Sequence, residues 1–364
     1  MKRKKAIVIY SVLIILCLVS IIDYMGLRSP AEVNNAKPAV QQAAAVQANK
    51  AVTGDSLDGE LDLLPEKVRE RVQKSSEIPS PTPVVGIGRG EDHGKVTSKA
   101  IENAGGLKDI VKNGDTVLIK PNLINGYPTG SAICTDPRIV QQIADMAKAC
   151  GAAKIIVAEA SMSGNVFKLA DYDKITDVEL VDMNQLEKKD CYLIKPEKSA
   201  TGKALYIPKM YMDADVVICA AKLKTHFQPD AVVTLSLKNS IGVPSNKIYN
   251  TVGYKNKLHE LGLKEVIVDL NKIRRPDFVV IDGILAGEGY GPLQCNPVKA
   301  NIVFAGVDPV AVDTIALNFM GFTIDQIPHV KLASDEGLGV SDLGKINIVG
   351  AVLDQIKMKF KPAS

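Results

Sequence analysis

The residues of this chain whose types and spacing best suit chemistry lie in residues 220–242, where two apolar runs each end in polar side chains. Those side chains are Lys222, Lys224, Thr225, His226, Lys238 and Asn239. A buried strand that delivers cations and a histidine at its carboxyl end is a common way for an α/β sheet to build a ligand site. Lysine and asparagine both donate hydrogen bonds to oxygen, so the pattern favours an anionic or carbonyl-bearing ligand.

Polar side chains follow four other apolar runs as well. They are Lys120 and Asn122 after residues 116–119, Glu159 after 154–158, Asp282 and Glu288 after 277–281, and Asp308 after 302–305. Because the carboxyl ends of parallel strands share one edge of a sheet, we expect all five clusters to converge there. The competing interpretation is that these residues only form turns and helix caps. It is the better interpretation for Asp136 and Asp308, since a proline follows each.

Residues 287–292 contain three glycines and form a candidate nest of backbone N–H groups for an anion, with Gly289 and Gly291 as its donors. A flexible turn explains the same residues equally well. They match neither the phosphate-binding loop nor the dinucleotide-binding motif. A serine-hydrolase elbow is also absent from the sequence.

The cysteines and histidines predict no local metal motif. The cysteines are Cys17, Cys134, Cys150, Cys191, Cys219 and Cys295, and the histidines are His93, His226, His259 and His329. The cysteines are widely spaced, so we expect no zinc ribbon and no iron–sulfur cluster. His226 and His259, together with Asp282 or Glu288, could still bind a divalent metal in space. A lone histidine more often has a structural role.

The elements that must position these residues follow an alternating pattern of strands and helices from residue 84 onward. Apolar runs at residues 84–87, 116–119, 154–158, 178–181, 215–220, 277–281 and 302–305 predict strands. Helices are predicted from Asp136 or Pro137 to Ala149, with Gly151 as the stop, and from Asp308 to Phe319. This alternation predicts an α/β fold with a mainly parallel sheet and helices on both faces, in three layers. We expect one domain over residues 82–352, with a tail at 353–364.

Composition excludes some classes of protein. The chain has 364 residues, 46% of them hydrophobic and 23% charged, with a net charge of +3 and no tryptophan. A nucleic-acid binder would show a basic excess and aromatic residues for stacking, so nucleic acid is not an expected partner.

The N-terminus predicts a membrane anchor. Residues 2–5 are Lys-Arg-Lys-Lys, and a mainly apolar run follows at residues 6–22. We favour an uncleaved signal-anchor over residues 1–27 that places the rest of the chain outside the cytoplasm. A cleaved signal peptide and a secreted protein are the alternative. Residues 28–81 are rich in alanine, glutamine and proline and predict a flexible, disordered spacer with one short helix at residues 64–74.

Several of these motifs together resemble the domain-of-unknown-function family 362. The resemblance rests on Val117-Leu-Ile-Lys-Pro-Asn122, Ala221-Lys-Leu-Lys-Thr-His226, Lys238-Asn-Ser-Ile-Gly242, Asp282-Gly283, Glu288-Gly-Tyr-Gly-Pro292, and Asp308 with Asp313. It covers about residues 82–350. Many members carry a ferredoxin-like [4Fe-4S] module or look exported, but this chain lacks the cysteine clusters of that module. The positions that the resemblance marks are Lys120, Asn122, Lys224, His226, Lys238, Asn239, His259, Asp282, Glu288 and Asp308.

Two functions are consistent with these observations. The first is an extracytoplasmic enzyme or cofactor-handling protein. In it, Lys224 and Lys238 neutralise a small anionic ligand, His226 or His259 acts as acid or base, and Asp282 or Glu288 orients it or holds a metal. Lys120, Asn122, Asn239, Gly289 and Gly291 would contact the ligand. The second is a membrane-tethered binding protein that uses the same residues without catalysis, for a small molecule or a polymer of the cell envelope.

Overall fold

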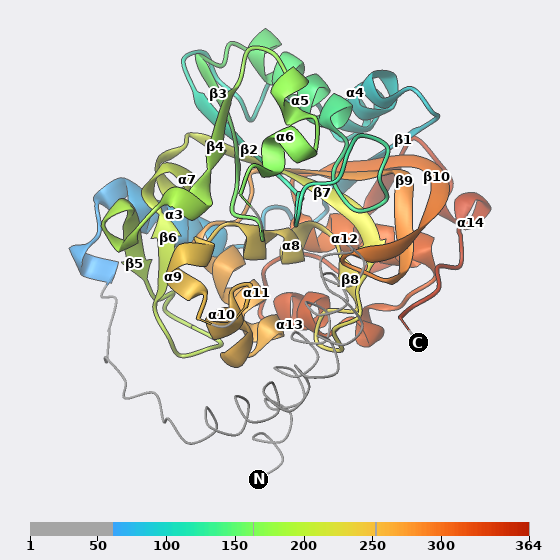
Figure 1. Ribbon diagram of the computed structural model, residues 1–364. Helices are drawn as coiled ribbons and strands as arrows, with labels where there is room; N and C mark the ends of the chain where they lie inside the picture. Colours follow the sequence, from blue (N-terminus) through green and yellow to red (C-terminus); the bar gives the residue numbers. More distant parts are fainter. Residues whose placement is uncertain (1–60, 163, 252, 364) are drawn as a thin grey trace, which may run out of the picture.

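The fold is described for residues 61–162, 164–251 and 253–363 of a computed structural model (Figure 1). The predicted anchor and most of the predicted spacer lie outside these ranges. Within them, no helix is both long enough and apolar enough to cross a membrane.

A nine-stranded sheet forms the centre of the domain, in the order β11-β1-β10-β9-β7-β2-β3-β4, with β8 paired to β7. Neighbouring strands from β9 to β4 are parallel, as are β1 and β11. The strands are β1 Val84–Arg89, β2 Thr116–Pro121, β3 Lys154–Glu159, β4 Glu179–Asp182, β7 Val216–Thr225, β8 Val233–Thr234, β9 Phe278–Tyr290, β10 Gln294–Gly306 and β11 Asn347–Val349. β5 Cys191–Ile194 and β6 Leu205–Pro208 form a separate pair. The predicted α/β fold with a mainly parallel sheet is confirmed.

Helices cover both faces of this sheet (Figure 1). The longer ones are α3 Glu66–Ser75, α4 His93–Asn103, α5 Pro137–Ala149, α11 Leu263–Ile273, α12 Pro309–Met320 and α13 Pro328–Asp335. The shorter ones are α6 Val166–Leu169, α7 Lys209–Asp213, α8 Ser236–Asn239, α9 Asn246–Tyr249, α10 Asn256–Glu260 and α14 Leu353–Ile356. Successive strand residues enter different cores: Ile119 and Ile218 pack with α4 and α5, whereas Leu118 and Val217 pack with α11 and α12. This alternation is the reason that both faces need helices.

The two predicted helices begin and end close to where the sequence places them. α5 begins after Asp136, whose carboxylate accepts a hydrogen bond from the N–H of Arg138. α12 begins after Asp308 and ends before Gly321, which has φ 86°. A proline at the first helical position has no N–H to leave unpaired, and a glycine takes up the left-handed C-terminal conformation without strain.

The strand that precedes Asp308 runs in the direction opposite to the predicted one. β10 is antiparallel to β9, and Gly306 lies opposite Val279 at the start of that strand. Asp308 therefore lies at the amino edge of the parallel strands, not at the shared carboxyl edge. Its oxygens accept hydrogen bonds from the N–H groups of Ala311 and Val340. The prediction that five clusters share one edge is wrong for Asp308, which is a helix cap.

Parts of the predicted spacer and tail belong to the folded domain. Helix α3 buries Val68 and Val72, and Arg71 donates hydrogen bonds to the carbonyl groups of Met212 and Ala214. Near the C-terminus Phe360 is buried, and backbone hydrogen bonds join this segment to α12. The domain is therefore larger than residues 82–352, because these flanking segments pack against its core.

Candidate functional site

The carboxyl ends of β2 and β3 are joined by a buried ion pair. The ammonium group of Lys120 donates to Glu159 Oε2 at 2.8 Å, to Asn239 Oδ1 at 3.0 Å and to the carbonyl of Pro121 at 2.7 Å. Asn239 returns a hydrogen bond to the carbonyl of Lys120 at 3.1 Å. All three protons of the ammonium group are thereby used. Lys120 and Asn239 fix α8 against the end of β2, with Asn122 beside them at 3.4 Å from Asn239 Oδ1.

A second buried ion pair joins the parallel strands β7 and β9, where Lys222 lies opposite Asp282. Lys222 Nζ donates to Asp282 Oδ2 at 2.8 Å, and both side chains are about 1% exposed. The same oxygen accepts the N–H of Asp136 at 2.9 Å, which ties the start of α5 to this edge. The opposite charges satisfy each other, so this pair is a structural link between strands.

Lys224 is buried without a carboxylate partner among the residues that the structure describes. Its ammonium group donates to the carbonyl groups of Ile133 at 2.6 Å and Pro292 at 3.4 Å. Burial lowers the pKa of Lys224 to about 8. Carbonyl groups satisfy the hydrogen bonds but do not cancel the charge, so Lys224 contributes a positive potential at this edge.

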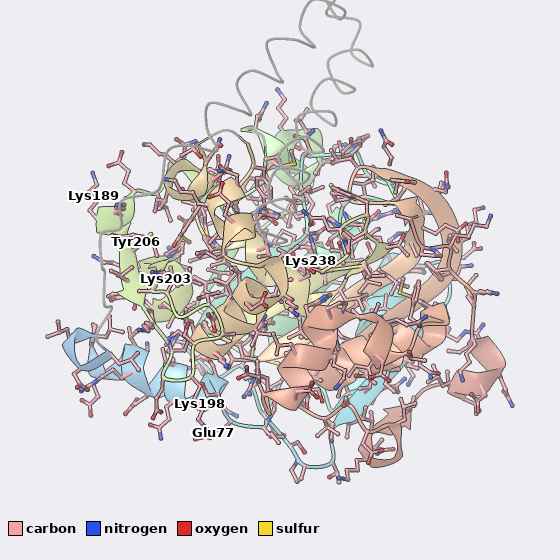
Figure 2. All side chains as sticks on the ribbon, turned by 90° about the horizontal axis from the view of Figure 1, so that it is seen from below. Glu77, Lys189, Lys198, Lys203, Tyr206 and Lys238 are labelled. Carbon is pink, nitrogen blue, oxygen red and sulfur yellow. The ribbon has the colours of Figure 1, made fainter. Side chains whose placement is uncertain are left out.

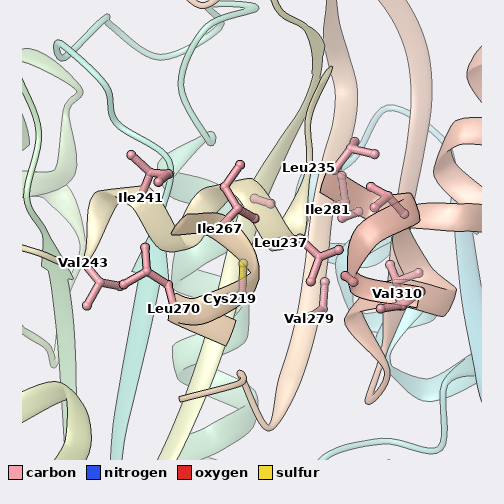
Figure 3. Packing of buried hydrophobic residues seen from close by; sticks show 14 of the residues in the cluster. Cys219, Leu235, Leu237, Ile241, Val243, Ile267, Leu270, Val279, Ile281 and Val310 are labelled. Carbon is pink, nitrogen blue, oxygen red and sulfur yellow. The ribbon is translucent and has the colours of Figure 1, made fainter. Parts of the chain in front are cut away.

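Helix α8 carries Lys238 and is held firmly at its start. Asp313 of α12 accepts hydrogen bonds from Ser236 N–H at 2.9 Å, Ser236 Oγ–H at 2.6 Å and Leu237 N–H at 3.1 Å. Burial raises the pKa of Asp313 to about 7, although these donors oppose the shift. Leu237 packs close to Val279 and Val310 (Figure 3). The backbone that positions Lys238 is therefore fixed by both polar and apolar contacts.

Lys238 itself has no ion-pair or hydrogen-bond partner for its amine among the residues that the structure describes. The side chain is half-buried. Burial and, to a lesser extent, the charges of Lys224 and Lys120 lower its pKa to about 7. Figure 2 shows Lys238 near the centre of the face formed by the lower helices, whereas Lys203 and Lys198 lie toward its periphery. A half-buried amine of this kind is unusual, because buried charges are normally paired.

Two predicted histidines lie near this amine and have opposite tautomers. His226 Nδ1 accepts the N–H of Gln228 at 3.2 Å, so the proton of its neutral ring is on Nε2. His259 Nδ1 lies 3.0 Å from the carbonyl oxygen of Lys255, which can only accept, so the free lone pair is on Nε2. Burial lowers the pKa of His226 well below its ordinary value and that of His259 to about 4, and the charge of Lys238 lowers both further. The Nε2–H of His226 can donate a hydrogen bond, whereas Nε2 of His259 can accept a hydrogen bond or a proton.

His329 of α13 is a third imidazole beside Lys238. It is fully buried, and neither ring nitrogen makes a hydrogen bond of regular geometry to the described part of the chain. Burial and the charge of Lys238 lower its pKa to about 3, although the backbone of Asp230 opposes this shift. The charge of Lys238 thus acts on three neutral imidazoles, and the charge of Lys224 acts on Lys238.

Gly289 and Gly291 do not form the predicted anion nest. The N–H of Gly289 donates to the carbonyl of Lys361, and the N–H of Gly291 donates to the carbonyl of Gly289, both at 2.9 Å. Both donors are therefore already used inside the protein. The glycines instead extend the β9–β10 hairpin.

The predicted metal ligands do not come together either. Asp282 is paired with Lys222, while Glu288 accepts the N–H of Lys361 at 2.9 Å near the C-terminus. No group of three or more histidine, cysteine, aspartate or glutamate side chains in the described residues is arranged to hold a metal ion. The charged groups at this edge that lack an opposite charge are cations, which suits an anion and repels a metal.

The family of the chain follows from a match to the family described as Domain of unknown function (DUF362). The match covers residues 117–318, more than half of the 364 residues, and includes the ends of β2, β3, β7 and β9. The chain is a DUF362 protein.

The similar proteins are few and differ in their descriptions. A thylakoid-associated protein of Synechocystis is 28% identical over 242 residues, which is 66% of this chain and 73% of that protein. Among solved structures, the lactate racemase apoprotein of Thermoanaerobacterium thermosaccharolyticum aligns with a TM-score of 0.43 and 15% identity, over 67% of this chain and 55% of its own. A protein of Thermotoga maritima aligns with a TM-score of 0.37 and 11% identity, over 68% of this chain and 60% of its own. This chain thus spans little more than half of either structure.

The DUF362 site also contains residues that the sequence did not mark. Glu159 was recognised as a strand-end residue but not as the partner of Lys120, although its place directly after an apolar strand was the available signal. Asp313 was part of the family motif without a role, and the structure makes it the cap of α8. His329 and Lys255 had no local pattern that could identify them.

Proposed function

We propose that the DUF362 domain binds a small anionic molecule at the carboxyl edge of its sheet, beside Lys238. The observation that carries the proposal is the amine of Lys238, which has no opposite charge within the described residues. Lys120 and Lys222 each have a buried carboxylate, at 2.8 Å in both cases, whereas Lys238 and Lys224 have none. An anion would supply the missing charge, and it would raise the pKa of Lys238 back toward the ordinary value of a lysine.

The surrounding groups suit an oxyanion in particular. The Nε2–H of His226 is a neutral donor, and Lys224 adds a fixed positive potential without requiring a further counter-ion. Charge-assisted hydrogen bonds from an ammonium group to an oxyanion are the stronger ones in proteins. A carboxylate or a phosphate group has this chemistry.

Binding is tested with two simple anions, glycolate and inorganic phosphate, by calorimetric titration of the purified full chain. Lys238→Met is expected to weaken binding by roughly tenfold or more, because one charge-assisted hydrogen bond and one charge are lost. Lys203→Met is the matched control, since Lys203 is exposed and lies away from the site. Equal affinities for the wild-type chain and Lys238→Met, with both folded by circular dichroism, would contradict the proposal.

Acid–base catalysis on the bound anion is the further part of this function, and the opposite tautomers of His226 and His259 favour it. A ligand that is converted during long incubation with the chain supports an enzyme. A ligand that is recovered unchanged supports a binding protein and leaves anion recognition as the whole function.

We also propose that residues 1–27 tether the domain to a membrane and hold it outside the cytoplasm. The basic residues 2–5 and the apolar run that follows support this, and a relative described as thylakoid-associated is consistent with it. The full chain is expected to stay in the membrane pellet after an alkaline wash, and its domain to be open to protease from outside intact cells. Ile15→Arg should release it, because a charge at the centre of the segment costs about 2.5–3.5 kcal/mol. A wild-type chain that is soluble without detergent, or a mature mass that lacks these residues, would contradict the anchor.

A further inference from the structure

We propose that Lys238 captures the carbonyl group of its anionic ligand as an imine, which makes a 2-oxo acid the class of substrate. This inference rests on the proposed function and deepens it. Anion binding needs only a positive charge, whereas imine formation needs a primary amine that is reachable, neutral for part of the time and close to groups that move protons.

The amine of Lys238 is reachable, in contrast to the other lysines of this edge. The amines of Lys120, Lys224 and Lys255 are each engaged in two or more hydrogen bonds; that of Lys255 donates to the carbonyl groups of Ala160 at 2.7 Å and Ile241 at 2.6 Å. Lys222 is paired with Asp282. Among the lysines of this sheet edge in the described ranges, Lys238 is the one whose amine makes no hydrogen bond or ion pair with the protein.

The surroundings of Lys238 also favour its neutral form. Burial and the charges of Lys224 and Lys120 lower its pKa to about 7, so about half of the molecules carry a neutral, nucleophilic amine at that pH. No carboxylate among the described residues pairs with it to restore the charge. A lysine in water is almost fully protonated at the same pH.

The two imidazoles assist imine formation in different ways. The nitrogen lone pair of Lys238 forms the C–N bond while the π electrons of the carbonyl group move to its oxygen, which accepts a hydrogen bond from the Nε2–H of His226. The nitrogen loses a proton to Nε2 of His259, and the imidazolium formed passes that proton to the oxygen. The hydroxyl group then takes a second proton from solvent and leaves as water, the nitrogen lone pair forms the C=N bond, and the nitrogen returns its remaining proton to solvent. One amine and one carbonyl group thus give one imine and one water, with no oxidant or reductant.

The buried His329 is a second, independent sign that a ligand belongs here. Both of its ring nitrogens lack a regular hydrogen bond to any described residue, and its pKa responds to the charge of Lys238. Buried polar atoms are normally satisfied by protein, water or ligand. An oxygen-rich molecule such as a 2-oxo acid offers acceptors at this position.

The test is reductive trapping of the full chain with glyoxylate and cyanoborohydride, followed by peptide mapping in a mass spectrometer. We expect the reduced adduct on Lys238 to exceed that on Lys203 by roughly tenfold or more, since the neutral fraction of a lysine sets its reactivity. Lys238→Arg keeps the charge but has no primary amine. It should lose the adduct at this position.

The outcomes separate the two proposals. Glycolate binding without an adduct on Lys238 would overturn the imine and leave the anion site intact. Adducts of equal yield on Lys238 and on exposed lysines would also overturn it. If glycolate binds to neither the wild-type chain nor Lys238→Arg, and no adduct forms, both proposals fall.

Discussion

Replacement of Asp282 by asparagine is expected to lower the free energy of unfolding by about 3–5 kcal/mol, because it leaves Lys222 as a buried charge without a partner. Both side chains of this pair are about 1% exposed and their atoms are 2.8 Å apart. The carboxylate also accepts the N–H of Asp136 and, at 3.2 Å, that of Ile284. Urea unfolding of the full chain, followed by circular dichroism, measures the effect.

Two further variants serve as controls for Asp282→Asn. Lys222→Met combined with Asp282→Asn removes both charges and should recover a large part of the loss, since the cost arises from an unpaired charge. Asp335→Asn breaks the exposed pair with Lys331, also at 2.8 Å, and should change stability far less than Asp282→Asn does. If Asp282→Asn and Asp335→Asn cost the same, the pair at the sheet edge is not the structural link that we describe.

The second large effect concerns His329 and pH. Burial holds the pKa of this ring at about 3, below the ordinary 6.5, so the unfolded chain binds the proton first as the pH falls. The neutral ring therefore adds no penalty above pH 6.5, and stability is lost as the pH falls from 6.5 toward 3. Each pH unit in this window costs about 1.4 kcal/mol, or about 2 kcal/mol at pH 5.

Unfolding at pH 7.5 and at pH 5 measures this loss. His329→Gln and His329→Phe should each reduce the difference between the two pH values by about 2 kcal/mol. Several other charged or titratable groups face Lys238 or α8: Lys120 and Glu159 at β2 and β3, Lys224 and His226 of β7 and its end, His259 of α10 and Asp313 of α12. Among them, the pKa of His226 is lowered also by the charge of His329, in the same direction as burial lowers it. Lys203→Met should keep the wild-type difference. A His329 variant that keeps it too would show that the ring is not held neutral.

The sheet strands that build the site could be predicted because their signals are local. β2, β3 and β7 are apolar runs closed by polar residues, and an Asp-Pro pair precedes α5 and α12. The direction of β10 could not be predicted in this way. Residues 287–292 suit an anion nest, a turn or a hairpin equally, and only the pairing of β10 with β9 and β1 decides between them. That pairing is a contact between distant parts of the chain, which carries no local pattern.

The same distinction between local signals and distant contacts applies to the residues of the candidate site. Lys120, Lys224 and Asn239 lie at the ends of apolar runs, so the sequence marks them as neighbours at one edge. Which lysine is paired and which is not depends on carboxylates that arrive from other strands, as Glu159 does for Lys120 and Asp282 for Lys222. The charge of Lys238 acts on His329 because α13 packs beside α8. The position of these residues at one edge of the sheet could therefore be predicted. Which of the lysines have a carboxylate partner could not.

The hydrogen bonds of this edge join residues that are far apart in the chain: 119 residues separate Lys120 from Asn239, and 146 separate Asp136 from Asp282. Contacts across such long loops form slowly, because the entropy of closing the loop opposes them until the strands between are in place. During synthesis the sheet edge cannot be completed until β9 has left the ribosome. A newly made chain that stops before Asp282 therefore carries Lys222 and Lys238 in an unfinished sheet, and the site comes into existence only with the folded domain as a whole.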